Sequence, residues 1–325
     1  MLLFSFAIIS GLIILIWSAD KFVSAAVATA LKLGMTPMMI GLTVVAFGTS
    51  APELIVSATA ALEGASHLAI GNAIGSNIAN IALVLGATAL VSAIPIKKSI
   101  LKVEFPTLLF ATLAASFLIC DGSLELVDGI GLSLILVFSL FALAKFQSPN
   151  QENDDEIENS KGLSPLKAYS LLAVSIILLV LSSKLLVWGA VGIATQLGIS
   201  KLVIGLTIIA IGTSLPELAA SIASALKGHH DLALGNIIGS NLFNLLAVLA
   251  IPAFIGWSQQ IDIVIEDLVL MRDYALMFGL TFGLAILAYI KYALGNFQFG
   301  KIVGTSLLLI YLGYLTILYQ QAIIT

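Results

Sequence analysis

Apolar runs of about 20 residues follow one another along almost the whole chain, with only short polar turns between them. A membrane hydrocarbon core of about 30 Å needs a helix of roughly that length. The pattern predicts an all-α polytopic membrane protein with ten transmembrane helices, near residues 2–31, 37–63, 67–94, 103–120, 124–146, 165–197, 201–227, 231–256, 266–290 and 299–321. We expect helices 2, 3, 7 and 8 to be broken.

The second half of the chain repeats the first at a constant spacing. The stretch GTSAPEL at residues 48–54 returns as GTSLPEL at 212–218, and GNAIGSNIAN at 71–80 returns as GNIIGSNLFN at 235–244. Glu217 minus Glu53 gives 164, and Gly205 minus Gly41 gives the same offset. Each copy holds five predicted helices, an odd number, so the second copy enters the membrane from the opposite side as an inverted repeat. The predicted units are residues 1–146, a linker at 147–163, and residues 164–325.

Composition agrees with a membrane protein. Hydrophobic residues make up 60% of the chain and charged residues 10%, with a mean hydropathy of +1.12, whereas soluble domains carry about 25% charged residues. No basic residue precedes the first apolar run, which favours a first transmembrane helix over a cleaved signal peptide. The net charge of −4 gives no indication of nucleic-acid binding. The single cysteine, Cys120, excludes an internal disulfide or a metal site built from cysteines.

The distribution of basic residues predicts the orientation. With the N-terminus outside, only Lys201 and Arg272 fall on the outer side, and the cytoplasmic side receives Lys32, Lys97, Lys98, Lys102, Lys145, Lys161, Lys167, Lys227, Lys291 and Lys301. The positive-inside rule therefore places both termini outside the cell membrane and the acidic linker in the cytoplasm. We interpret that linker as a solubilising loop in preference to a calcium sensor.

A glutamate lies inside a membrane-buried helix in each copy, at Glu53 and Glu217. A charge at this depth costs roughly 2.5–3.5 kcal/mol on insertion scales, and inverted repeats bring equivalent positions together near the bilayer centre. Pro52 and Pro216 precede the glutamates and are predicted to break helices 2 and 7, because proline lacks the N–H of the helical ladder. The break is expected to free backbone carbonyls, such as that of Ala46, to face a cavity.

Hydroxyl and amide side chains accompany both glutamates. Thr49 and Ser50 share a helix face with Glu53, and SAPE has the spacing of a capping box, with Ser50 as a possible N-cap; Thr213, Ser214 and Ala210 repeat this arrangement. In the next helix of each copy, polar stripes comprise Asn72, Ser76 and Asn80, and Asn236, Ser240 and Asn244. Asn72, Asn77, Asn236 and Asn241 are equally compatible with ion binding and with bonds that join helices or orient the glutamates. Gly71, Gly75, Gly235 and Gly239 favour close helix packing.

The combined candidate site contains oxygen ligands only, which hard cations such as Na⁺ and Ca²⁺ prefer, whereas zinc and copper favour imidazole or thiolate. Two carboxylates balance one Ca²⁺ or two Na⁺. Competition between these ions for one site is the outline of an antiport mechanism.

The paired stretches resemble the two alpha-repeats of the cation/calcium exchanger superfamily, and most closely its prokaryotic sodium/calcium exchanger branch. The resemblance implies sodium-driven calcium transport by alternating access, with no cofactor, in a chain that functions singly in the lipid bilayer. It also implies that the first helix of each copy slides to switch access. By motif position the ion ligands would be Thr49, Ser50, Glu53, Ser76, Asn80, Thr213, Ser214, Glu217, Ser240 and Asn244, with the carbonyls of Ala46 and Ala210. Several relatives carry Asp at the position of Asn244, so the ion stoichiometry is open here.

Three alternative functions remain. Proton/calcium exchange is the nearest, since a buried glutamate also binds a proton, although the Thr–Ser pairs favour sodium. A cation channel would be built around an oligomeric axis, and no catalytic constellation supports an enzyme. Other charged residues are interpreted as peripheral. Asp20 and Lys21, with Lys184 at the repeat position of Asp20, lie in first helices, where extension of the lysines toward an interface is favoured over an interhelical ion pair. We place in loops His67, His229 and His230, and in an external acidic cluster Asp262, Glu266, Asp267 and Asp273.

Overall fold

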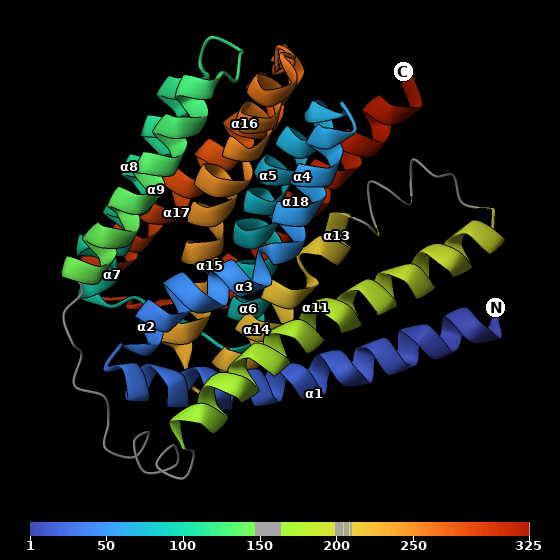
Figure 1. Ribbon diagram of the computed structural model, residues 1–325. Helices are drawn as coiled ribbons and strands as arrows, with labels where there is room; N and C mark the ends of the chain where they lie inside the picture. The colour runs from blue at the N-terminus through green and yellow to red at the C-terminus, as the bar shows by residue number, and fades with distance from the viewer. Residues whose placement is uncertain (147–163, 199–203, 205–207, 209, 325) are drawn as a thin grey trace.

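Helices make up most of the chain in the computed structural model, which describes residues 1–146, 164–198, 204, 208 and 210–324 (Figure 1). Eight helices of the described residues are long and apolar enough to cross a membrane: Leu2–Leu33, Ser66–Val91, Lys98–Ile119, Leu126–Phe146, Pro165–Gln196, His230–Gln259, Val269–Ala293 and Lys301–Gln321. A pair bent by 41°, Pro37–Thr49 with Ala51–Leu62, would make a ninth span. The predicted seventh helix, 201–227, lies partly outside the described residues.

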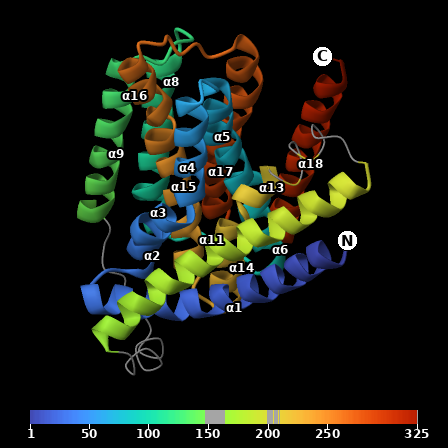
Figure 2. The ribbon, with the colours of Figure 1, turned by 45° about the vertical axis from the view of Figure 1, so that its right-hand side comes forward.

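Two long helices lie against each other across the rest of the bundle. These are α1 (Leu2–Leu33) and α11 (Pro165–Gln196), which run antiparallel and obliquely past the other helices (Figures 1 and 2). Their backbones approach closely: a Cβ at Gly11 would lie 3.1 Å from the Leu186 nitrogen, and one at Gly189 would lie 2.8 Å from the Phe4 carbonyl oxygen. Small residues at these crossings therefore hold α1 and α11 together as one unit.

The second helix of the first copy is interrupted at Ser50. It consists of α2 (Pro37–Ile40), the π-helical segment η1 (Gly41–Val45), α3 (Ala46–Thr49) and α4 (Ala51–Leu62). Pro52 occupies the first turn of α4, where its missing N–H costs nothing. In the second copy, α13 (Ala210–Thr213) precedes Ser214 and α14 (Leu215–Leu226) follows it. Both prolines thus lie at helix starts.

The expected breaks in the third and eighth helices are not observed. The third helix runs continuously through α5 (Ser66–Ala79), η2 (Asn80–Leu85) and α6 (Gly86–Val91). The eighth runs through α15 (His230–Phe243), η4 (Asn244–Val248) and α16 (Ala250–Gln259). Neither helix contains a proline before its π-helical turn. The backbone hydrogen bonds in this turn have the wider i→i+5 spacing, and the helix continues without a break. Such turns are frequent at functional sites, and here they begin at Asn80 and Asn244.

The helix boundaries around the glutamate motif in the second half repeat those in the first half. The helices α4 and α14 span residues 51–62 and 215–226, and α5 and α15 span 66–79 and 230–243. Each boundary differs from its counterpart by the offset of 164 found in the sequence. In Figure 1, α4 and α14 extend from the centre toward opposite ends of the bundle.

The remaining helices flank this centre: α7 (Lys98–Lys102), α8 (Glu104–Ile119), α9 (Leu126–Phe146), η5 (Val269–Tyr274), α17 (Ala275–Ala293) and α18 (Lys301–Ile324). One small feature contradicts a purely helical chain. The strand β1 (Ile94–Pro95) pairs antiparallel with β2 (Gln298–Phe299), with Ile94 opposite Phe299. The third predicted helix therefore ends before residue 94, because this segment pairs with the turn that precedes α18.

Two predictions about charged and histidine residues are wrong. Asp273 does not belong to an exposed acidic cluster, because it lies within η5 and is 6% exposed. Its carboxylate binds Arg272 through contacts of 2.6 and 2.7 Å and accepts the Tyr314 hydroxyl at 3.0 Å, so α18 covers it. His67 and His230 lie in the first turns of α5 and α15, not in loops.

Candidate functional site

Both glutamates of the repeated motif are buried at the starts of helices. Glu53 is 1% exposed in the first turn of α4, and Glu217 is 0% exposed in the first turn of α14. The free N–H groups of a first helical turn favour negative charge. Ser50, which directly precedes α4, contacts the Glu217 carboxylate at 3.3 Å. The helix starts of the two copies therefore meet and bring like charges together.

The serines before the glutamates occupy the predicted N-cap positions but do not cap. Neither Ser50 nor Ser214 makes a side-chain cap bond. The Ser50 hydroxyl donates instead to Glu217 Oε1 at 3.3 Å, and the buried Ser214 hydroxyl has no partner among the described residues. The capping-box spacing thus predicted the helix start correctly, whereas the side chain of Ser50 contacts the glutamate of the other copy.

An asparagine holds the backbone of each glutamate. The Asn72 amide donates to the Glu53 carbonyl oxygen and to Ser57 Oγ, both at 3.1 Å. In the second copy, Asn236 donates to the Glu217 carbonyl oxygen at 3.4 Å and to Ser221 Oγ at 3.0 Å. Ser57 and Ser221 were not among the predicted site residues. The repeat offset relates them as well, since 221 minus 57 is 164, so the sequence contained a signal for both.

Thr49 links the second helix of the first copy to the eighth helix. Its hydroxyl donates to Asn236 Oδ1 at 3.1 Å and lies 3.5 Å from Ser240 Oγ. Thr213, its repeat counterpart, is half-buried. The amide of Asn77 contacts Met277 Sδ at 3.4 Å, and that of Asn241 donates within its own helix to the Ile237 carbonyl at 2.8 Å. These two asparagines make contacts that stabilise the helices.

Several buried polar atoms of these helices have no hydrogen-bond partner among the described residues: Glu53 Oε2, Glu217 Oε2, Ser214 Oγ, Asn77 Oδ1, Asn80 Nδ2, and both amide atoms of Asn244. Leaving a polar group buried and unsatisfied costs about 1–3 kcal/mol, and more when it is charged. The segment η2 packs against α14, and η4 packs against α4. Each amide-bearing π-helical turn therefore adjoins the glutamate helix of the other copy.

The donor set of the described site fits a hard cation. Within the described chain, no group of three or more His, Cys, Asp and Glu side chains is placed to hold a metal. The available ligands are thus two carboxylates together with buried hydroxyls and amides, including Ser76 and Ser240. Oxygen ligands of this kind suit Na⁺ or Ca²⁺.

The Ala46 carbonyl is not freed as expected. It accepts the Ser50 backbone N–H at 3.0 Å, because α3 completes a turn before the interruption. Thr49 Oγ1 lies 3.4 Å from the same oxygen. Ala210 begins α13 in the second copy.

Close packing between the copies is confirmed at two of the four predicted glycines. A Cβ at Gly239 would lie 2.5 Å from the Leu42 carbonyl oxygen, and one at Gly235 would lie 2.5 Å from the Met38 carbonyl oxygen. For Gly71 and Gly75, no atom of the described residues lies within 4 Å of the added Cβ. The contact of α15 with η1 therefore permits no side chain at Gly235 or Gly239.

Comparison with known proteins agrees with this arrangement. A family model described as sodium/calcium exchanger protein matches residues 3–146 and 167–320. The chain is 44% identical to the putative antiporter CaxA of Alkalimonas amylolytica, covering 99% of this chain and 100% of that protein. It is 31% identical to the sodium/calcium exchanger MaX1 of Methanosarcina acetivorans, covering 74% and 80% of the two chains.

A solved structure shares the fold. The sodium-calcium exchanger NCX_Mj, in crystals soaked with Na⁺ and Sr²⁺, superposes with a TM-score of 0.79 and 32% sequence identity, covering 100% of this chain and 99% of that one. The two segments matched by the family model contain the glutamate motifs of both halves. The two relatives each align with most of the chain. The chain therefore belongs to the sodium/calcium exchanger family, as a member of the prokaryotic branch of the cation/calcium exchanger superfamily.

Proposed function

We propose that this chain exchanges Na⁺ for Ca²⁺ across the cell membrane by alternating access, with the ions bound at an all-oxygen site near the bilayer centre. The observation that carries the proposal is the meeting of two buried glutamates from equivalent helix starts, each with one carboxylate oxygen that has no hydrogen-bond partner among the described residues. The hydrogen bond from Ser50 to Glu217 supports a single shared site, since it joins the two halves beside both carboxylates.

The proposed architecture is ten transmembrane helices in two inverted five-helix repeats, residues 1–146 and 164–325, joined by the linker 147–163. The repeated helix boundaries and the antiparallel course of α1 and α11 support it (Figure 1). The two family matches, one in each half, support it as well. The lysine distribution favours both termini outside and the linker in the cytoplasm.

The proposed ligands are the two glutamates with the hydroxyls and amides around them: Thr49, Ser50, Ser76, Asn80, Thr213, Ser214, Ser240 and Asn244, and the carbonyl of Ala210. Asn72 and Asn236 have a different role, because their amides already hold the glutamate backbones. Two carboxylates balance one Ca²⁺ or two Na⁺. The empty site keeps two like charges together at low dielectric, which favours a change of access only when ions are bound.

The experiment that tests the proposal is calcium flux into vesicles containing the purified protein. We expect an outward Na⁺ gradient at clamped pH to drive Ca²⁺ uptake, and uptake to saturate with external Ca²⁺. Uptake driven by a proton gradient without Na⁺, and absent with Na⁺ alone, would assign proton/calcium exchange instead. Single-channel currents without counterflow would contradict exchange altogether.

The substitution Asn244→Asp should change ion coupling. Both amide atoms of Asn244 are buried without partners among the described residues, so a carboxylate would add a third charge to the site. We expect tighter Ca²⁺ binding and a changed number of Na⁺ ions per Ca²⁺, measured by reversal potentials and isotope flux in vesicles. Unchanged coupling and affinity would exclude Asn244 from the ion site.

The substitution Asn236→Ala should weaken transport without abolishing it. It removes the bonds to Glu217, Ser221 and Thr49 but leaves both carboxylates, so we expect apparent Ca²⁺ affinity to fall about tenfold, the equivalent of one or two hydrogen bonds of about 1 kcal/mol each. Asn241→Ala is the matched control, since the bond that its amide makes among the described residues lies within its own helix. Equal effects of the two substitutions would contradict a positioning role for Asn236.

A further inference from the structure

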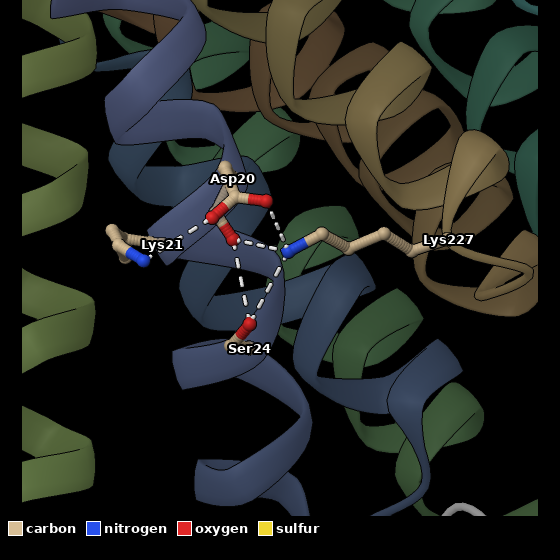
Figure 3. Close-up of polar contacts among 4 residues, drawn as sticks. All are labelled: Asp20, Lys21, Ser24 and Lys227. Carbon is tan, nitrogen blue, oxygen red and sulfur yellow. Dashed lines mark hydrogen bonds and ion pairs between the residues drawn. The ribbon is translucent and has the colours of Figure 1, made fainter.

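Lys227 connects the end of a glutamate helix to the middle of α1. It is the C-cap residue of α14, and its Nζ lies 2.6 Å from Asp20 Oδ1, 2.7 Å from the Asp20 carbonyl oxygen and 3.3 Å from Ser24 Oγ (Figure 3). An ammonium group has three donors, so this arrangement gives each donor one acceptor on α1. Lys21 contacts Asp20 Oδ2 at 3.4 Å from the other side of α1 (Figure 3).

The contact between Lys227 and Asp20 joins α14 to the unit formed by α1 and α11. The unit of α1 and α11 is joined by backbone contacts at Gly11 and Gly189, so α11 follows any displacement of α1. Lys227 lies ten residues beyond Glu217 on the chain, at the far end of α14. The ion pair therefore links the α1–α11 unit to a helix of the candidate site.

The repeat contains the same pair with its charges exchanged. Subtracting 164 from 184 gives 20, and subtracting 164 from 227 gives 63, so Lys184 corresponds to Asp20 and Glu63 corresponds to Lys227. Glu63 is the C-cap residue of α4, as Lys227 is of α14. Opposite charges thus occur at equivalent positions in both copies.

Only one of the two pairs is formed. In the part of the chain that the structure describes, the exposed side chains of Lys184 and Glu63 make no hydrogen bond or ion pair. The helices around them differ in the same way, since α1 packs extensively against α14, whereas in the described residues α11 and α4 make at most slight contact. The two halves therefore adopt different arrangements around the α1–α11 unit, as expected for one end state of a transport cycle.

We propose that Asp20 and Lys227 are positioning residues that hold the α1–α11 unit at the cytoplasmic end of the core in this conformation, and that Lys184 and Glu63 form the equivalent pair in the opposite one. The inference depends on the proposed alternating access through an inverted repeat. In such a transporter each copy adopts, in one state, the arrangement that the other copy has in the second state. An exposed ion pair shifts an equilibrium by up to about fivefold, enough to bias access without preventing exchange.

The test measures the two conformations directly. Spin labels are attached to cysteines at Leu62 and Leu181, which are 59% and 55% exposed and lie beside Glu63 and Lys184, with Cys120→Ser removing the native thiol. Distance distributions from pulsed electron paramagnetic resonance then report the population in which α4 approaches α11. We expect Asp20→Asn to increase the short-distance population about three- to fivefold, and Glu63→Gln to decrease it.

Two further variants separate the pair from general effects of charge. Lys21→Gln is the matched control and should leave the populations unchanged, because Lys21 contacts Asp20 within α1 and makes no hydrogen bond or ion pair with α14 among the described residues. The combined exchange Asp20→Lys with Lys227→Asp should restore the native distribution. The inference is overturned if Asp20→Asn and Glu63→Gln leave the populations unchanged or shift them in the same direction. Absence of Ca²⁺ exchange by the native protein in vesicles would instead refute the proposed function, independently of these distances.

Discussion

Replacing either buried glutamate with glutamine, Glu53→Gln or Glu217→Gln, is expected to abolish calcium exchange in vesicles while the protein still folds. Glutamine keeps the size of the side chain and removes one of the two charges that balance a cation. Two unit charges about 4 Å apart interact by about 4 kcal/mol at an effective dielectric constant near 20, and about 1.4 kcal/mol corresponds to tenfold in affinity. Ca²⁺ binding should therefore weaken by more than about 100-fold.

Thermal unfolding separates loss of binding from loss of fold. Without ions, the glutamine variants should unfold at the same temperature as the native protein or higher, because one of two buried like charges is gone. Saturating Ca²⁺ at about 100 times the dissociation constant stabilises a binding protein by about 2.7 kcal/mol, and this increment should disappear. Near-normal exchange by either variant would show that the ion site lies elsewhere.

The second large effect is expected from Gly239→Ala, which places a methyl group between the two copies. The added Cβ would lie 2.5 Å from the Leu42 carbonyl oxygen and 2.6 Å from Ala46 Cβ. Neither atom belongs to a flexible side-chain end, so α15 must move away from η1. Overpacking of this kind costs about 1–3 kcal/mol, occasionally more, and we expect the unfolding free energy to fall by about 3 kcal/mol.

The same displacement should reduce transport, because Ser240 follows Gly239 and lies beside Thr49. The matched control is Gly279→Ala in α17, where no described atom lies within 4 Å of the added Cβ. Alanine is favoured over glycine inside a helix by about 0.5–1 kcal/mol, so the control should be slightly more stable. If both variants unfold alike in detergent or lipid, the close contact at Gly239 does not determine stability.

Much of the fold and of the candidate site could be predicted because the second half of the chain repeats the first at a constant offset. Helix starts at Ala51 and Leu215 follow from proline and N-cap positions, which act within a few residues of the chain. The burial of both glutamates follows from the apolar sequence around them. The π-helical turns at Asn80 and Asn244 were predicted as breaks, since a widened helix has no distinctive residue comparable to proline.

The environment of charged residues could not be predicted from the local sequence pattern. Asp273 lies in a segment rich in acidic residues, yet α18 covers it and Tyr314 donates a hydrogen bond to it. Asp20 and Lys227 are separated by more than 200 residues and pair across helices. Helical periodicity indicates the face on which each residue lies but not the helix that packs there.

The sequence by itself determined the duplicated design, the succession of apolar helices and the oxygen chemistry around two buried acids, because each depends on composition and spacing along the chain. Only the tertiary structure decided that Ser50 contacts the glutamate of the other copy, that Asn72 and Asn236 hold the glutamate backbones, and that one of two equivalent ion pairs is formed. These contacts depend on the relative placement of helices from different halves, and many packing interactions spread over the whole bundle set that placement.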